Sequence, residues 1–295
     1  SNDEWADIDY FFVQVQALEK VVDFTTTCGN MLSAVGPAAI EMGLVKAKTD
    51  ETIIKIRAVN TGGRFVSKVK TPNGNLVYKG KTCIDGVPGT AAPVELKFMD
   101  ITGSKTGEFL PTGNLKDLID GIEVTCMDVT MPVVIGRAAD FGISGYEERE
   151  KLDLNKTLFS RMESIRLQAA KLMGLGDASG SVAPKFALFA PPKQGGSLCV
   201  RYFMPWQTHP TLAVTSSQCL AACALTIGSV ADGLVDQLNG NSSDVLFEHP
   251  LGFMNVRLDY QDNGVHSVVR SAQIVRTARK LSSGLIYIPS SIWRA

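Results

Sequence analysis

The stretch that decides the fold is TTTCGNMLSAVGPAAIEMGLV, residues 25–45. Three threonines lead into Cys28, and the residues that follow are almost wholly uncharged and apolar. This pattern predicts a helix that is buried on all sides, with the threonine hydroxyls capping its first turn and Gly43 ending it. Because a helix N-terminus favours negative charge, we expect Cys28 to be a reactive thiol, and the same place suits a carboxylate ligand.

A second stretch, TSSQCLAACALTIGSVADGLV (residues 215–235), aligns with the first without a gap at an offset of 190 (215 minus 25). Both stretches have hydroxyl residues, an apolar body and a final Gly-Leu-Val. Two alanine-rich buried helices can also look alike by chance. If the repeat is real, two helix N-termini meet at one cleft, where Cys28 faces Gln218 and Cys219 faces Gly29.

Short segments that alternate apolar and polar residues surround the two helices. We expect strands at residues 9–17, 52–59, 64–69, 76–78, 94–99, 122–129, 133–138, 184–190, 198–204, 256–260, 265–275 and 285–289. The pattern predicts an α+β fold of two pseudo-repeated lobes, each a mixed, mainly antiparallel sheet wrapped around a central buried helix. An amphipathic helix over residues 153–176 should cover the outside of the second sheet. A loop over residues 102–121 separates a first lobe, residues 1–117, from a second lobe, residues 118–295.

Composition excludes several classes of function. Lys plus Arg number 29 against 30 Asp plus Glu, which gives no reason to expect nucleic acid or an anionic membrane as a partner. No apolar run reaches the roughly 18 residues of a membrane span, and the acidic N-terminus is unlike a signal peptide, so we expect a cytoplasmic protein. The six cysteines form no CxxC pair, and the three histidines lack metal-site spacing, so we expect no metal.

Several motifs in a fixed order resemble the PrpF family. They are CGNMLSAVGPAAIEMGLV (28–45), GVPGTAAPVELKF (86–98), GSKTGEFLPTGN (103–114), DVTMPVVIGRAADFGISGYE (128–147) and RTARKLSSGLIYIP (276–289). The resemblance runs from about residue 7 to residue 289. It implies a diaminopimelate epimerase-like fold with the active site between two lobes. The family begins with a further stretch that supplies a lysine thought to act with the cysteine matching Cys28, and this sequence starts after that stretch.

The same resemblance implies an isomerase of unsaturated di- and tricarboxylates, such as 2-methylaconitate, aconitate, methylitaconate or 4-oxalomesaconate, without a metal or organic cofactor. The expected partner is therefore a small polycarboxylate, and a homodimer is one option for the assembly. A proton shift of this kind needs a base, a group that stabilises the carbanion, and an acid. Cys28 is the candidate for proton transfer, the alternative being one more buried thiol.

Candidate substrate-binding residues have polar groups near the helix starts or in loops. They are Thr27, Gly29, Asn30, Asn60, Thr61, Gly62, His209, Thr215, Ser216, Ser217 and Arg276. Most have a structural alternative: helix capping for the hydroxyls, a hairpin turn for 60–62, a surface loop for His209, and a surface ion pair for at least one of Arg276 and Arg279. Lys185 also matches a family lysine, or it supports a loop. Two rival functions stay open: a catalytically inactive or truncated binding or accessory protein of this kind, and an amino-acid epimerase.

Overall fold

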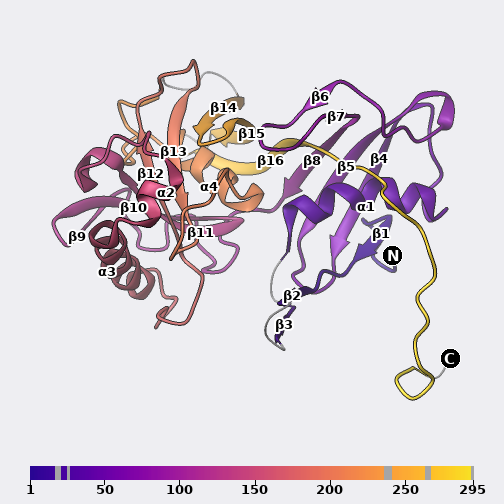
Figure 1. The fold of residues 1–295 in the computed structure, drawn as a ribbon, viewed down its shortest axis with the longest axis horizontal. Coiled ribbons are helices and arrows are strands. Elements are labelled where there is room, and N and C mark those ends of the chain that lie inside the picture. Colours follow the sequence, from indigo (N-terminus) through magenta and orange to yellow (C-terminus); the bar gives the residue numbers. More distant parts are fainter. Residues whose placement is uncertain (17–20, 25–26, 236–240, 263–266, 294–295) are drawn as a thin grey trace.

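The structure is a computed structural model that describes residues 1–16, 21–24, 27–235, 241–262 and 267–293. One mixed sheet of 12 strands crosses it in the order β1-β4-β5-β8-β16-β15-β14-β13-β12-β11-β10-β9 (Figure 1). Its strands are β1 (Ile8–Tyr10), β4 (Asp50–Ala58), β5 (Arg64–Thr71), β8 (Pro93–Met99), β9 (Asp117–Ile119), β10 (Ile122–Val129), β11 (Met131–Arg137), β12 (Lys185–Ala190), β13 (Leu198–Phe203), β14 (Ser242–His249), β15 (Gly252–Asp262) and β16 (Ser267–Thr277). The helices are α1 (Gly29–Glu41), α2 (Arg149–Asp153), α3 (Lys156–Leu172) and α4 (Val214–Ala224), and two small strand pairs are β2 (Gln14–Gln16) with β3 (Val21–Asp23) and β6 (Thr82–Cys83) with β7 (Thr90–Ala91).

Burial along the strands shows which faces of the sheet are covered. In β4 buried residues such as Ile54 and Ile56 alternate with outward residues, because α1 covers only one face there. In β10 and β13 nearly every residue is buried, since α4 packs on one face and α3 on the other. The predicted outer helix is therefore confirmed as α3, which begins after the capping side chain of Asn155.

The helix of the opening stretch is shorter and more exposed than the sequence predicts. It runs from Gly29 to Glu41 and ends before Gly43, whose φ of 70° confirms it as the stop. The expectation that it has no solvent face is wrong, because Met31 is 57% exposed. Only the side that packs on the sheet is covered. α4 fits the prediction better, since all of its residues except Thr215 are buried.

Strand β16 joins the N-terminal strands β1, β4, β5 and β8 to the remaining strands of the sheet. It pairs antiparallel with β8 through contacts such as Ile274 with Leu96, and with β15 through contacts such as Ala272 with Leu258. The expectation of a separate sheet in each lobe is therefore wrong, because strands far apart in sequence form one sheet. The α+β class with a large mixed sheet is confirmed, whereas the lobe boundary near residue 117 stays a prediction.

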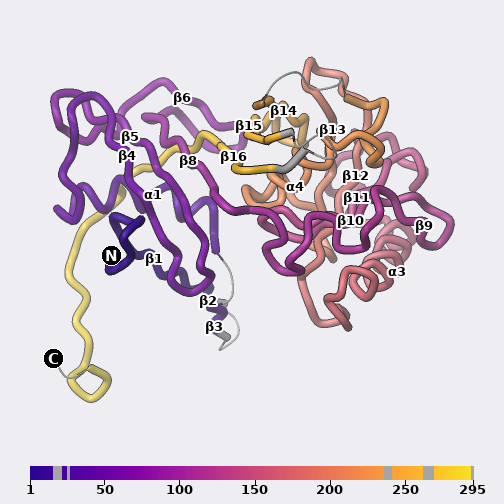
Figure 2. Tube along the Cα trace, turned by 180° about the vertical axis from the view of Figure 1, so that it is seen from behind, coloured from indigo at the N-terminus to yellow at the C-terminus, as the bar shows by residue number. Residues whose placement is uncertain are grey.

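The chain after β16 leaves the body of the molecule. It passes α1, where Lys280 pairs with Glu41 at 2.7 Å, and then extends away from the fold (Figure 2). The predicted strand at residues 285–289 is wrong, because no described strand lies beside it, and Ile286 is 89% exposed. Residues 76–78 also form no strand. No helix in the described ranges is long and apolar enough to cross a membrane.

Candidate active site

The first turns of α1 and α4 touch each other. Cys28 is the N-cap residue of α1, with φ −100° and ψ 111°, and Gly29 follows it as the first helical residue. A Cβ atom at Gly29 would lie 2.5 Å from Cγ1 of Val214, the first residue of α4. Only glycine permits this approach, so the sequence Cys-Gly brings the thiol to the point where the two helix N-termini meet.

The helix starts lie 185 positions apart (214 minus 29), and not 190 as the sequence repeat predicts. The residue that corresponds to Cys28 is therefore Ala213, and the expected pairing of Cys28 with Gln218 is wrong. Gln218 lies one turn into α4, fully buried, and its Oε1 accepts a hydrogen bond of 2.6 Å from Thr130. Cys219 is also fully buried, and burial raises the pKa of its thiol well above the ordinary value. The sequence alignment paired the hydroxyl residues of the two stretches, but in the structure α4 begins at Val214, before those residues.

Cys28 lies beside the uncapped first turn of α1 and beside the phenol of Tyr10. The thiol is free and half-buried, and no side chain caps α1, so in the described structure the first-turn N–H groups have no capping partner. The Oη atom of Tyr10 is buried and has no hydrogen-bond partner among the described residues. Burial and the neighbouring Cys28 raise the pKa of Tyr10 to about 12. No pattern in the sequence singles out Tyr10, because tyrosine is common in any strand.

The turn between β4 and β5 lies against the segment that enters α1. Thr27 Oγ1 and Thr61 Oγ1 share a hydrogen bond of 3.0 Å. Asn60 Nδ2 donates to the carbonyl of Phe12 at 3.1 Å and to that of Phe24 at 2.8 Å, which fixes the chain ahead of Cys28. The structure thus brings the predicted residues 60 and 61 to the cysteine.

Two expectations about these residues need correction. Thr27 was expected to cap α1, but its hydroxyl bonds to Thr61 instead, and Thr25 and Thr26 lie outside the described residues. Gly62 was expected to offer its N–H to a carboxylate, but it donates to the carbonyl of Ala58 at 2.8 Å within the turn. Asn30, in the first turn of α1, is exposed.

The hydroxyl residues of α4 lie inside the helix and do not cap it. Ser216 shares a buried hydrogen bond of 2.6 Å with Tyr202 Oη, and Ser217 donates to the carbonyl of Val214 at 2.9 Å. The predicted capping by 215–217 is therefore wrong, because α4 begins at Val214. Thr215 alone of the three is not fully buried, so it is the one whose hydroxyl can face a ligand.

His209 and Lys185 lie near the start of α4. The ring of His209 meets that of Tyr202 edge-on with centroids 5.7 Å apart, and its Nδ1 accepts from the N–H of Thr211 at 3.0 Å. Burial lowers the pKa of His209. Lys185 is half-buried, has no hydrogen bond or ion pair with any described residue, and burial lowers its pKa to about 8. His209 is thus packed and partly buried, which does not fit the alternative of an exposed loop residue.

Arg276 lies apart from these residues, in a pocket between β15 and β16. It is buried, so the alternative of a surface ion pair does not hold for Arg276, and Cys28 does not line that pocket. Among the described residues no group of three or more histidine, cysteine or acidic side chains could hold a metal ion. The structure therefore brings together one thiol, two helix N-termini, Tyr10 and Thr215, an arrangement that can move a proton and bind a carboxylate.

Comparisons with known proteins agree with the motifs. The family profile described as PrpF protein matches residues 1–289. The chain is 44% identical to a (4E)-oxalomesaconate Delta-isomerase of Novosphingobium sp. over 282 residues, which are 96% of this chain and 78% of that protein. It is 41% identical to a 4-oxalomesaconate tautomerase of Pseudomonas putida over 98% of this chain and 79% of that one. The crystal structure of a methylitaconate-delta-isomerase matches with a TM-score of 0.85 and 28% identity, covering 99% of this chain and 80% of that one.

Proposed function

This chain belongs to the PrpF protein family and is an isomerase, and we propose that it moves a proton within unsaturated di- or tricarboxylates such as 4-oxalomesaconate, methylaconitate or aconitate. The observation that carries the proposal is the contact between the starts of α1 and α4, 2.5 Å from a Gly29 Cβ to Val214 Cγ1, with Cys28 as the N-cap residue there. Fixed N–H dipoles at this point would hold a carboxylate and stabilise charge that develops on it.

In the proposed reaction the Cys28 thiolate removes a proton from the carbon next to the double bond. The electrons of the broken C–H bond delocalise through the double bond into the carboxylate, whose oxygens receive the first-turn N–H groups. The Cys28 thiol then returns a proton to the other end of the allylic system, which moves the double bond. Tyr10 Oη, buried beside Cys28 without a partner among the described residues, would hydrogen-bond the thiolate.

One structural observation argues against an amino-acid epimerase. That mechanism uses a thiol on each side of the substrate, but Ala213 occupies the α4 position that corresponds to Cys28. The nearest thiol in α4, Cys219, is fully buried and directed to the carbonyl of Met127 at 3.4 Å. A single thiol favours an isomerase that takes and returns the proton on one face. The cytoplasmic location and the homodimer remain proposals.

Proton NMR in deuterium oxide tests the proposal, with 4-oxalomesaconate, methylaconitate and cis- and trans-aconitate as substrates. Isomer conversion would identify the substrate, and partial retention of the original proton would support the single thiol, since two separate bases would give full exchange. Cys28→Ser should lower the rate by at least about 100-fold. The control is Ser160→Ala, which removes a single exposed oxygen from the outer helix α3, on the face of the sheet away from α4, and should leave the rate unchanged. No conversion of any substrate would favour a binding protein without catalysis.

A further inference from the structure

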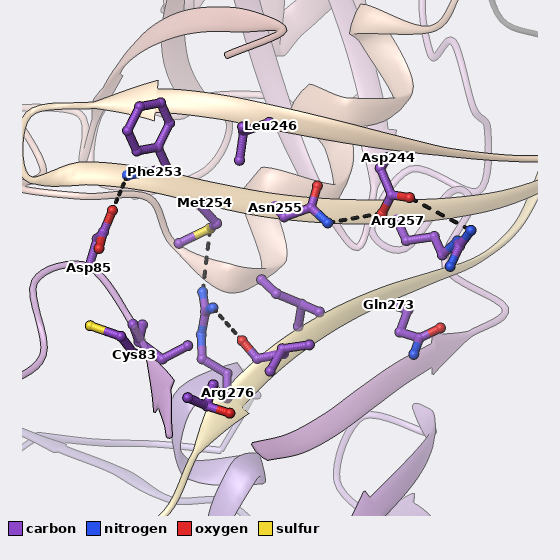
Figure 3. Close-up of a pocket in the computed structure, with 14 residues that line it drawn as sticks. Cys83, Asp85, Asp244, Leu246, Phe253, Met254, Asn255, Arg257, Gln273 and Arg276 are labelled. Atoms are coloured by element: carbon purple, nitrogen blue, oxygen red, sulfur yellow. Dashed lines mark hydrogen bonds and ion pairs between the residues drawn. The ribbon is translucent and has the colours of Figure 1, made fainter. Parts of the chain in front are cut away.

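The large sheet forks where β15 and β16 separate. Pairing between them reaches Arg257 with Gln273 and is not recorded beyond it among the described residues. From there β15 continues beside β14 as far as Gly252, while β16 continues beside β8 as far as Thr277. Figure 3 shows the two strands diverging at this point. The fork lies at the junction between the N-terminal strands and the remainder of the sheet.

A pocket of about 430 Å³ occupies the fork. It is lined by Phe253, Met254 and Asn255 from one strand and by Ile274, Val275 and Arg276 from the other. The segment of residues 82–85 closes one side, and Asp85 Oδ2 fixes it there by accepting the N–H of Phe253 at 2.6 Å (Figure 3). This volume is within the range of small-molecule sites.

Arg276 is a buried cation that forms no ion pair with any described residue. It is 8% exposed, and its recorded hydrogen bonds are to the carbonyl of Val275 at 2.9 Å and to the thioether sulfur of Met254 at 3.4 Å. A thioether is a weak acceptor, so most of the five guanidinium donors are unused within the described structure. Burial lowers the pKa of Arg276 to about 10, which still leaves it charged at neutral pH.

Other buried arginines in the described structure have more acceptors than Arg276. Arg201 is 5% exposed and also lacks an ion pair with any described residue, but it donates to the carbonyls of Glu147 at 3.2 Å and Val200 at 3.0 Å. Arg166 is fully buried, but it pairs with Glu163 at 2.7 Å and also donates to backbone carbonyls. Arg257 lines the same pocket as Arg276, but it is half exposed and lies 3.7 Å from Asp244. Because burying an uncompensated charge is costly, Arg276 calls for an anion that enters the pocket from solution.

A second buried polar side chain, that of His249, lies near the fork. His249, at the end of β14, is 6% exposed, and its Nδ1 accepts from the N–H of Leu251 at 3.2 Å. In the neutral ring the proton then lies on Nε2, which is buried without a hydrogen-bond partner among the described residues. Burial is the main cause that lowers the pKa of His249, and the charges of Arg201 and Arg276 add to it, whereas a hydrogen bond with the backbone of Phe253 and the Asp85 carboxylate oppose it.

We propose that the fork pocket is a carboxylate-binding subsite in which Arg276 holds a carboxylate of the substrate away from the reacting carbons. A guanidinium matches a carboxylate with two parallel hydrogen bonds. The subsite adjoins the cysteine helix, because Ser33 Oγ, which donates to the carbonyl of Asn30, lies 3.4 Å from the carbonyl oxygen of Thr277, and Ser33 is about 7.5 Å along α1 from Cys28. That the ligand is a polycarboxylate rests on the proposed function; the need for an anion does not.

Cys83 offers a test that does not depend on turnover. It is exposed and lines the pocket, so its alkylation by iodoacetamide, followed by peptide mass spectrometry, reports whether the pocket is filled. The experiment uses the Cys28→Ser variant, so that the Cys28 thiol is not alkylated. The ligand is tricarballylate, a saturated tricarboxylate that cannot isomerise, and it should slow alkylation of Cys83. Arg276→Gln should weaken this protection at least about 10-fold, because it removes a charge-assisted pair. The matched control is Arg279→Gln, which removes the same charge from an exposed position outside the pocket and should leave protection intact.

Steady-state kinetics of proteins that retain Cys28 complete the test. Arg276→Gln should raise KM for tricarboxylates more than it lowers kcat, and Arg276→Lys should recover part of the affinity. Circular dichroism melting shows whether the variants fold. If Arg276→Gln does not fold, the same measurements are made on Arg276→Lys. Equal protection of Cys83 in wild type and Arg276→Gln overturns the subsite. Protection that depends on Arg276 in a protein that isomerises nothing overturns the isomerase proposal and leaves the subsite standing.

Discussion

Replacing Gly29 with alanine tests the contact on which the proposed active site depends. The new Cβ would lie 2.5 Å from Cγ1 and 2.7 Å from Cβ of Val214. Rotation of the Val214 side chain cannot relieve the second contact, because Cβ is fixed to the backbone of α4, so the helices must move apart. Overpacking of this kind costs about 1–3 kcal/mol. Gly29 is the first residue of α1, where little of the preference for alanine over glycine in a helix interior applies, so most of this cost, about 1–3 kcal/mol, should remain.

Urea unfolding followed by circular dichroism measures this loss, and a double-mutant cycle assigns it to Val214. Val214→Ala removes both γ-carbons but leaves Cβ, so it should restore only part of the stability lost in Gly29→Ala. Val214→Gly removes the whole obstacle, and in that background Gly29→Ala should be neutral or favourable. Gly180→Ala is the control, because no atom lies within 4 Å of a Cβ there.

Activity of the same variants gives a second readout. Separating the helix starts by even 1 Å should lower the isomerisation rate by about 100-fold, because proton transfer depends on position. A Gly29→Ala protein with wild-type stability, or an equal loss in the Val214→Gly background, would refute the contact and with it the shared site at the helix starts.

Three further predictions concern buried polar groups. Glu248→Gln should lower the free energy of unfolding in urea by about 1–3 kcal/mol. The buried carboxylate accepts hydrogen bonds from Tyr146 and from the N–H groups of Lys193, Gln194 and Gly196. An unchanged free energy of unfolding would show that these bonds contribute nothing. Burial lowers the pKa of His249 from 6.5 to about 4, so the unfolded chain binds a proton that the fold rejects, and stability should fall as pH drops from about 6.5 to 4; His249→Gln should flatten this part of the profile. The pKa of Lys185 is lowered from 10.5 to about 8, so stability should rise as pH rises through that window, and Lys185→Met should abolish the rise; a rise that persists would mean that another group titrates.

Local patterns predicted much of the secondary structure. Alternating residues located β4, β5 and β8 to within about two residues, because one face of each is buried and the other is not. β14 was missed, since Ser242 to His249 mixes polar and apolar residues without a clear period. The strand expected at 285–289 has the right residues but no described neighbour, and a strand needs a partner as well as a propensity.

The candidate site was predictable only in part. Cys28 and the turn at 60–61 were predicted from residue types that carry the chemistry, and the structure places this turn against the segment that enters α1. The contact between Gly29 and Val214, and the approach of Tyr10 to the thiol, depend on how distant segments pack, which no local pattern encodes. For the same reason the repeat was placed five positions away from the true correspondence of the helix starts, 185 and not 190.

The pairing of β8 with β16 sets an order of events during synthesis. On the ribosome β8 is complete once Met99 has been added, but the strand that covers its edge begins only at Ser267. At roughly 5–20 residues per second, that edge waits on the order of 10–30 s for its partner. During this interval the nascent N-terminal strands offer an open row of backbone groups, which a chaperone or another nascent chain can reach before residue 267 emerges.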